Sequence, residues 1–193
     1  MMTSARKLVF ILSFVILSCN SSSKNNIDEI VSIVGRTMGT TYSVKYATPV
    51  KSNDNIIENK NKIEEILRNV NMQMSTYIAE SEISKFNRMR NTEWVSISED
   101  FAFVVQSSFE YYDMSGGLYD ITVMPLVNLW GFGPDKFIDT PSTTNIDSVL
   151  AFVGQDLIEI QGSRIRKKDP RVQIDLSSIA VSYTHLRAHE TLI

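Results

Sequence analysis

The chain has 193 residues, of which 43% are hydrophobic and 21% charged, a balance typical of one folded domain with a short additional segment. Its formal net charge of −3 argues against a nucleic-acid-binding protein, since such proteins carry a basic stripe. Beyond the N-terminal segment, no apolar run approaches the roughly 20 residues that cross a bilayer.

The N-terminus has the pattern of a bacterial lipoprotein signal peptide. Arg6 and Lys7 precede an apolar run over residues 8–17, which is too short to span a bilayer comfortably, and Cys19 follows closely. We expect residues 1–18 to be a signal peptide that is removed, and Cys19 to be lipidated. An ordinary secretory signal with an incidental buried cysteine is the alternative.

Residues 19–28 begin with a polar stretch rich in serine and asparagine, which suits a flexible tether between a lipid anchor and a folded domain. Because Cys19 is the only cysteine, the chain forms no internal disulfide even in an oxidising compartment. We therefore expect a lipid-anchored, extracytoplasmic protein of the bacterial cell envelope, on the periplasmic side of a membrane.

The patterns along the chain predict an α+β fold. Residues 30–35 and 41–47 are β-rich and are expected to pair as strands through residues 36–40. The next element is an amphipathic helix, whose apolar stripe follows the spacing i, i+3, i+4, i+7 and i+11: Ile63, Ile66, Leu67, Val70 and Met74.

A second helix is expected to begin after Ser98 as its N-cap and to end at residues 115–117. Its apolar face consists of Phe101, Val104, Val105, Phe109 and Tyr112. Farther on, residues 146–152 predict a short helix, and residues 157–161, 164–167 and 172–175 predict strands, the first two turning at Gly162 and Ser163.

Residues 115–134 read SGGLYDITVMPLVNLWGFGP. Paired glycines allow a close approach of the backbone to a ligand, and Asp120 and Thr122 are expected to share one face of a short extended run. Trp130 and Phe132 could form a flat apolar wall. The alternative is a helix C-cap followed by a turn.

This stretch resembles the signature SGGxxDxTxxPLxxLWGFG of the ApbE family, the FAD:protein FMN transferases. Three further pieces resemble the same family in the same order. Residues 35–42 resemble GxxMGTxY, residues 72–87 contain a match to MSTYxxxSExSxxN, and residues 173–180 resemble the start of xxDLxxIAKGYA. The resemblance implies that residues 29–180 form the N-terminal part of an ApbE-like, T-fold-like domain with a mixed or antiparallel sheet and packed helices.

Members of this family are implied to bind FAD and a divalent metal, usually magnesium. They transfer FMN to a threonine or serine of a target flavoprotein, typically a subunit of a membrane redox complex. Magnesium would offset the charge that develops on the phosphates. Carried over by position, the residues implied to contact FAD are Met38, Tyr77, Leu118, Tyr119, Asp120 and Asp175, and the Ser178 carbonyl is implied to bind the metal.

The resemblance stops after Ala180. The family pattern has lysine at position 181, followed by Gly-Tyr-Ala, whereas this chain has Val181 and a tail over residues 181–193 that resembles a translated sequencing adapter. We expect this tail to be foreign and the chain as written to be inactive in transfer. His185 and His189 both lie in the tail, and an i, i+4 histidine pair can bind zinc on a helix, but the sequence offers no further ligand nearby.

Two other functions remain open from the sequence. One is a surface lipoprotein that binds a flavin or a partner without chemistry, and the other is an FAD pyrophosphatase. Transfer and hydrolysis begin with attack at the same phosphate and differ in the access of the acceptor, so the residues above do not separate them.

The lipid anchor has a direct test. Mass spectrometry of the mature N-terminus, from protein made in a bacterial host, should find Cys19 as the first residue with a diacylglyceryl group on its thiol. A Cys19→Ser variant should lose the modification, since serine has no thiol to carry the diacylglyceryl group. An unmodified Cys19 in the mature protein contradicts the prediction.

Overall fold

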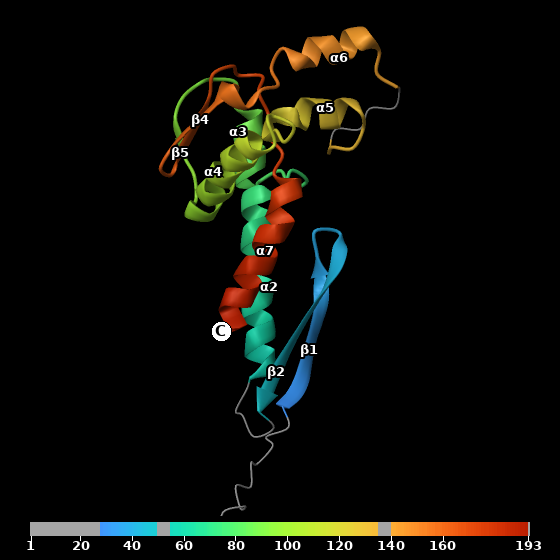
Figure 1. Cartoon of the computed structure of the whole chain (residues 1–193), viewed down its shortest axis with the longest axis vertical. Coiled ribbons are helices and arrows are strands. Elements are labelled where there is room, and N and C mark those ends of the chain that lie inside the picture. Colours follow the sequence, from blue (N-terminus) through green and yellow to red (C-terminus); the bar gives the residue numbers. More distant parts are fainter. Residues whose placement is uncertain (1–27, 50–54, 135–139, 193) are drawn as a thin grey trace, which may run out of the picture. The chain divides into compact units, whose positions relative to one another are not determined.

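The computed structural model describes residues 28–49, 55–134 and 140–192 (Figure 1). The predicted signal peptide, Cys19 and nearly all of the predicted tether lie outside the described residues. These residues divide into two units, 28–32 with 45–49 and 33–44 with 55–134 and 140–192. No helix among them combines the length and hydropathy of a membrane-spanning segment.

The first two strands form the predicted hairpin, with longer strands than expected. Strands β1 (Asp28–Thr37) and β2 (Thr40–Pro49) pair in a two-stranded sheet. They are joined by Met38 and Gly39, whose φ angles are +49° and +73°. Two consecutive positive φ angles are typical of the tight turns that match the twist of a hairpin. The smaller unit consists of the ends of these strands that lie away from the turn.

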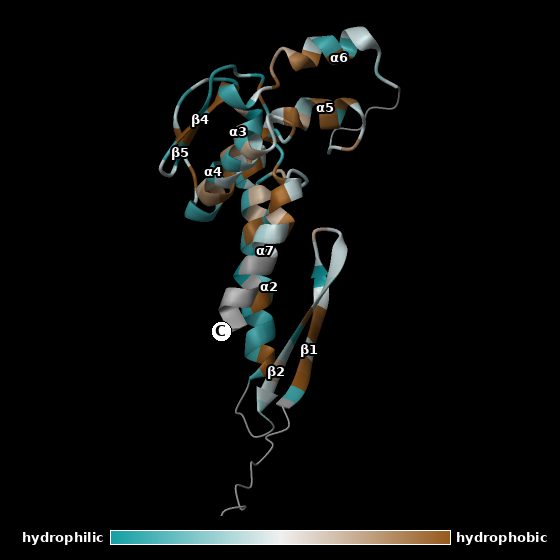
Figure 2. Cartoon of the chain, viewed as in Figure 1, coloured by the Kyte–Doolittle hydropathy of each residue, from teal (hydrophilic) through white to brown (hydrophobic). Residues whose placement is uncertain are grey.

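Helix α2 (Ile56–Met74) confirms the predicted amphipathic stripe and begins before it. Asn55 caps its N-terminus, since its side-chain oxygen accepts from the backbone N–H of Glu58 at 3.1 Å. Hydrophilic and hydrophobic residues alternate along this helix (Figure 2). The buried residues are the predicted Ile63, Leu67, Val70 and Met74.

Helix α4 (Glu99–Met114) is also confirmed, with Ser98 as its N-cap. It ends as expected, because Gly116 and Gly117 adopt φ angles of +64° and +84° and the Gly117 N–H bonds to the carbonyl of Tyr112 at 2.9 Å. The short helix α3 (Glu82–Arg88) precedes it.

The second sheet has three antiparallel strands in the order β3–β5–β4. Strands β4 (Ile158–Gln161) and β5 (Arg164–Lys167) form the predicted hairpin, and β3 (Val95–Ser96) was not predicted. Ile165 of β5 faces Val95 on one side and Ile160 on the other. A 3₁₀ turn, η2 (Gln155–Leu157), leads into β4. Helix α6 (Thr143–Leu150) confirms the predicted short helix, but it begins three residues earlier than expected.

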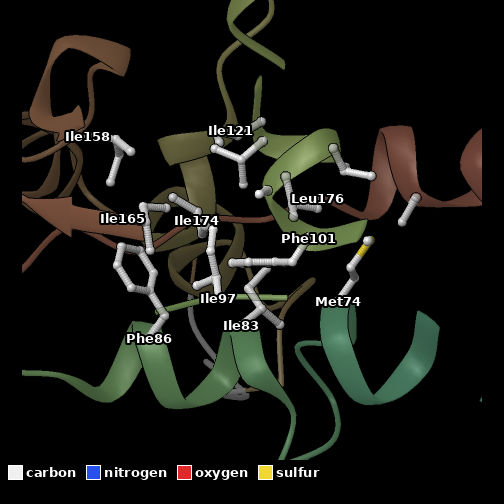
Figure 3. Packing of buried hydrophobic residues seen from close by; sticks show 14 of the residues in the cluster. Met74, Ile83, Phe86, Ile97, Phe101, Ile121, Ile158, Ile165, Ile174 and Leu176 are labelled. Carbon is white, nitrogen blue, oxygen red and sulfur yellow. The ribbon is translucent and has the colours of Figure 1, made fainter. Parts of the chain in front are cut away.

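One core joins α2, α3, α4, the three-stranded sheet and the segments that follow it (Figure 3). Figure 3 shows Phe101 of α4, Ile83 and Phe86 of α3, and Met74 of α2 pointing into it, together with apolar residues of the C-terminal segments. Those C-terminal residues include Ile158, Ile165, Ile174 and Leu176.

Two predicted extended segments were wrong. Residues 120–122 do not form an extended run, because Asp120 instead caps the 3₁₀ turn η1 (Ile121–Val123). Its Oδ1 accepts from the Thr122 N–H at 2.7 Å and from the Thr122 hydroxyl at 2.6 Å. Helix α5 (Met124–Leu129) then begins with Pro125 in its first turn, where a missing N–H costs little.

Residues 172–175 form no strand, because the partner of Ile174 is a side chain. The Asn87 Nδ2 donates to the Ile174 carbonyl, and the Ile174 N–H donates to Asn87 Oδ1, both at 2.8 Å. The next N–H, that of Asp175, donates to the Ile121 carbonyl at 2.7 Å. These hydrogen bonds therefore hold the segment in place without making it part of a sheet.

The motif around Asn87 connects three helices. The Ser81 hydroxyl caps α3 by accepting from the Ser84 N–H at 3.1 Å and donates to the Ser75 carbonyl, just after α2, at 2.6 Å. The Glu82 carboxylate accepts from the Ser98 N–H at 2.6 Å and from the Ser98 hydroxyl at 2.7 Å. The polar residues of this motif therefore fix the end of α2 and the starts of α3 and α4.

The Lys167 side chain forms hydrogen bonds at the C-terminal end of α3. Its side chain is 1% exposed, and its Nζ donates to the carbonyls of Asn87 and Met89, both at 3.1 Å, beside the Phe86 ring. Carbonyl groups at the end of a helix have no backbone donor within the helix, so the Lys167 ammonium supplies the missing partner. Burial, together with the charge of Arg90, lowers the pKa of Lys167 to about 8.

Helix α7 (Ser177–Leu192) was not predicted, and it runs through residues expected to be foreign. It lies beside α2 (Figure 1). Tyr183 is buried, and its hydroxyl donates to Asp100 Oδ1 of α4 at 2.5 Å. The foreign origin of residues 181–193 stays a prediction.

The Asn87 contact predicts a large effect on stability. Asn87→Ala removes two buried hydrogen bonds and leaves the Ile174 N–H and C=O without partners, at about 1–3 kcal/mol for each group. We expect the free energy of unfolding to fall by about 2–4 kcal/mol in urea titrations followed by tryptophan fluorescence. Asn91→Ala, at an exposed asparagine, is the control. Equal stability of the two variants would show that the contact is dispensable.

Candidate functional site

A cavity of about 1250 Å³ lies in the larger unit. It is lined by the turn between β1 and β2, one face of α2, the turn after α2, part of α5 with the loop that follows it, and the start of α7. Ligand sites are typically concave, mostly apolar and furnished with a few polar groups. This cavity has that composition.

Helix α2 contributes a second stripe, next to its buried one. Glu64, Arg68, Asn71 and Met72 line the cavity, at spacings of four, three and one residues that keep them on one side of the helix, and Ser75 lines it just after the helix ends. The Asn71 Nδ2 donates to the Thr37 hydroxyl of β1 at 2.9 Å. This hydrogen bond fixes the turn end of the hairpin beside α2.

Four methionines give the cavity a soft apolar wall: Met38, Met72, Met74 and Met124. Val127 and Phe132 extend this wall. Thioethers are polarisable and adapt to aromatic surfaces. The wall can therefore pack against a flat ring system.

Three of the residues carried over from the family resemblance line this cavity, namely Met38, Tyr77 and Asp175. The Tyr77 hydroxyl donates to the Phe132 carbonyl at 2.8 Å, which ties the loop after α5 to the end of α2. Asp175 Oδ1 accepts from the Ser177 N–H at 2.9 Å and from the Ser177 hydroxyl at 2.5 Å. The Asp175 carboxylate thereby caps the start of α7.

The other four carried-over residues do not line the cavity. Tyr119 and Ser178 lie in a separate hollow of about 420 Å³, where the Ser178 hydroxyl donates to the Tyr119 hydroxyl at 3.2 Å. Burial raises the pKa of Tyr119. Leu118 is 92% exposed, and Asp120 Oδ1 accepts both hydrogen bonds from Thr122.

The sequence patterns missed the charged lining residues Arg36, Glu64 and Arg68. Charged residues on an amphipathic helix normally indicate a solvated face, so α2 alone did not single them out. The available signal was that Glu64, Arg68 and Met72 repeat every four residues directly beside the buried stripe.

The described residues fit a flavin better than a metal. The volume and the methionine wall suit a large flat ligand. Among the residues that the structure describes, no group of three or more histidine, cysteine, aspartate or glutamate side chains could hold a metal ion. Magnesium needs near-octahedral oxygen coordination, and Glu64 and Asp175 are the only carboxylates among the described residues that line the cavity.

The ApbE family model matches residues 38–193. The chain is 35% identical over 184 residues to the FAD:protein FMN transferase of Haemophilus influenzae, covering 92% of this chain and 53% of that protein. It is 37% identical over 154 residues to the FAD:protein FMN transferase of Vibrio cholerae, covering 79% of this chain and 46% of that protein.

Solved structures give the same result. The flavin transferase ApbE from Vibrio cholerae superposes with a TM-score of 0.82 at 35% identity, over 86% of this chain and 53% of that one. The apo form of the Pseudomonas stutzeri flavinyl transferase ApbE gives a TM-score of 0.77 at 30% identity, over 85% and 54%. The chain thus spans about half the length of the curated relatives it matches.

The hydrogen bond from Tyr77 to Phe132 predicts a tethered loop at the cavity. Tyr77→Phe keeps the ring but loses a bond of about 1 kcal/mol, so the open population of the loop should rise about fivefold. In a Trp94→Phe background, Trp130 is the sole tryptophan and reports on this loop.

Acrylamide should then quench Trp130 more strongly in Tyr77→Phe than in the parent. Tyr111→Phe, at a half-exposed tyrosine outside the cavity, is the matched control and should leave quenching unchanged. Equal quenching in all three proteins would mean that the loop does not depend on Tyr77.

Proposed function

Since the chain belongs to the ApbE family, we propose that it supplies a flavin-binding part of an FAD:protein FMN transferase. The reaction moves FMN from FAD to a threonine or serine hydroxyl of a target flavoprotein. The observation that carries this proposal is the methionine-walled cavity, with Tyr77 and Asp175 at its lining.

The cavity suits the flavin of FAD in shape and chemistry. The isoalloxazine ring is flat and aromatic, and it can pack on the thioethers of Met38 and Met72 and on the ring of Tyr77, all of which are exposed. The Asp175 carboxylate can accept a hydrogen bond from an N–H or O–H of the ligand. Because Asp175 is fixed by Ser177 and by the Ile121 carbonyl, it is oriented before the ligand arrives.

The transfer step requires little covalent chemistry from the protein. The acceptor hydroxyl oxygen forms a bond to the FMN phosphorus, the phosphoanhydride bond breaks, AMP leaves with the bridging oxygen, and the hydroxyl proton passes to solvent. Catalysis of phosphoryl transfer depends mainly on positioning and charge stabilisation. The described residues bind and orient the flavin end of FAD.

Magnesium also belongs to this proposal as the ion that offsets phosphate charge. The residues that the structure describes do not fit it by themselves, since they include no cluster of ligands, and Ser178 lies in the smaller hollow rather than in the cavity. We assign no step to the ion. We accordingly expect this chain alone to bind FAD without transferring FMN.

The setting is proposed from the N-terminal sequence. The basic residues, the short apolar run and Cys19 support a lipid-anchored protein on the extracytoplasmic side of a bacterial membrane. The proposed acceptor is accordingly a flavoprotein subunit of a membrane redox complex.

Titration of the chain into FAD, followed by flavin fluorescence, tests the proposal. We expect saturable quenching, and we expect Asp175→Asn to weaken FAD binding about tenfold, as the loss of a charge-assisted hydrogen bond does. Asparagine keeps an oxygen that can cap Ser177, so α7 should remain intact by circular dichroism. Leu118→Ala, at an exposed residue outside the cavity, is the control.

The products separate the alternative activities. Incubation with FAD, magnesium and a threonine-containing acceptor should give no fluorescent acceptor band and no free FMN. Release of FMN without labelling would establish an FAD pyrophosphatase, and magnesium-dependent labelling would place the transfer machinery within this chain. Absence of any FAD quenching would refute the proposed function.

A further inference from the structure

The cavity contains two cations that form no ion pair with its described carboxylates. Its charged lining residues, among those that the structure describes, are Arg36, Glu64, Arg68 and Asp175. Glu64 lies 3.7 Å from Lys60 Nζ, and Asp175 caps α7 through Ser177. Within the described residues, neither Arg36 nor Arg68 forms an ion pair.

One hydrogen bond brings the two arginines to the same part of the cavity. Arg36 precedes Thr37, whose hydroxyl accepts from Asn71 at 2.9 Å. Arg68 lies three residues before Asn71, which places both on one side of α2. Both guanidinium groups are therefore carried by elements that meet at this contact.

The spacing along α2 fits a flavin nucleotide. Arg68 and Met72 are four residues apart, so they lie on the same face of α2, about 6 Å apart along the helix axis. The five-carbon ribityl chain that separates the flavin ring from its phosphate covers a similar length. A ring packed on Met38 and Met72 would therefore bring the phosphates to the level of Arg68.

Guanidinium groups suit this ligand because their planar set of donors matches phosphate oxygens and stays charged at every relevant pH. We propose that Arg36 and Arg68 bind the phosphates of the flavin dinucleotide, while Met38 and Met72, the exposed methionines of the cavity, contact its ring. This inference rests on the proposed function. On this inference, the negatively charged phosphates of the substrate are bound on the side of the cavity formed by β1 and α2.

The test compares FAD with riboflavin, which has the ring but no phosphate, in the chain and in Arg36→Gln, Arg68→Gln and the double variant. We expect each single variant to weaken FAD binding about tenfold and to leave riboflavin binding unchanged. Added salt should weaken FAD binding more than riboflavin binding, since it screens exposed charges. Arg164→Gln removes an exposed arginine that lies over Trp94, outside the cavity, and serves as control.

The outcomes separate this inference from the function it rests on. If the parent chain binds riboflavin and FAD but the arginine variants bind FAD equally well, the phosphate assignment is wrong while flavin binding stands. If the variants lose riboflavin and FAD affinity in parallel, the arginines act on the structure of the cavity, which also overturns the assignment. If the parent chain binds neither flavin, both the proposed function and this inference fail.

Discussion

The cavity depends on a buried exchange of two hydrogen bonds between the Asn87 side chain and the Ile174 backbone. This contact replaces a missing strand neighbour and holds the segment that leads to Asp175. Asn87 is held in turn, because its own carbonyl accepts from Lys167 at the end of α3. Buried polar groups are costly unless they are paired, so the network specifies one arrangement of this segment. The result is a carboxylate fixed at the start of α7 before any ligand binds.

Helix α2 serves the fold and the site with adjacent stripes. One stripe, which includes Val70 and Met74, packs into the core, and its neighbour presents Arg68 and Met72 to the cavity. The two sides meet at Met74, which is buried in the core and also lines the cavity. Because core side chains are packed at close to crystal density, this part of the cavity wall has little freedom to move, and the ligand therefore meets a preformed surface.

The sequence was sufficient where the signal was local. Periodicity predicted the hairpin, α2, α4 and the β4–β5 pair, and the family resemblance named Met38, Tyr77 and Asp175, which lie together. The sequence patterns failed at residues 172–175, because the partner of Ile174 is a side chain 87 residues away. They also failed at residues 120–122, because the Asp120 side chain caps a 3₁₀ turn there instead of lying in an extended run. Arg36 and Arg68 were missed for a related reason. The contact between Asn71 and Thr37 brings their two elements together, and it joins residues 34 positions apart.

A crystal structure of the chain with FAD bound tests the central claim most directly, namely that these residues form a flavin-binding cavity before the ligand arrives. The account predicts the isoalloxazine ring against Met38 and Met72, with the hydrogen bonds between Asn87 and Ile174 unchanged and Asp175 still capping α7. Density for the flavin in the hollow beside Tyr119, or a segment around Ile174 that rearranges on binding, would contradict it.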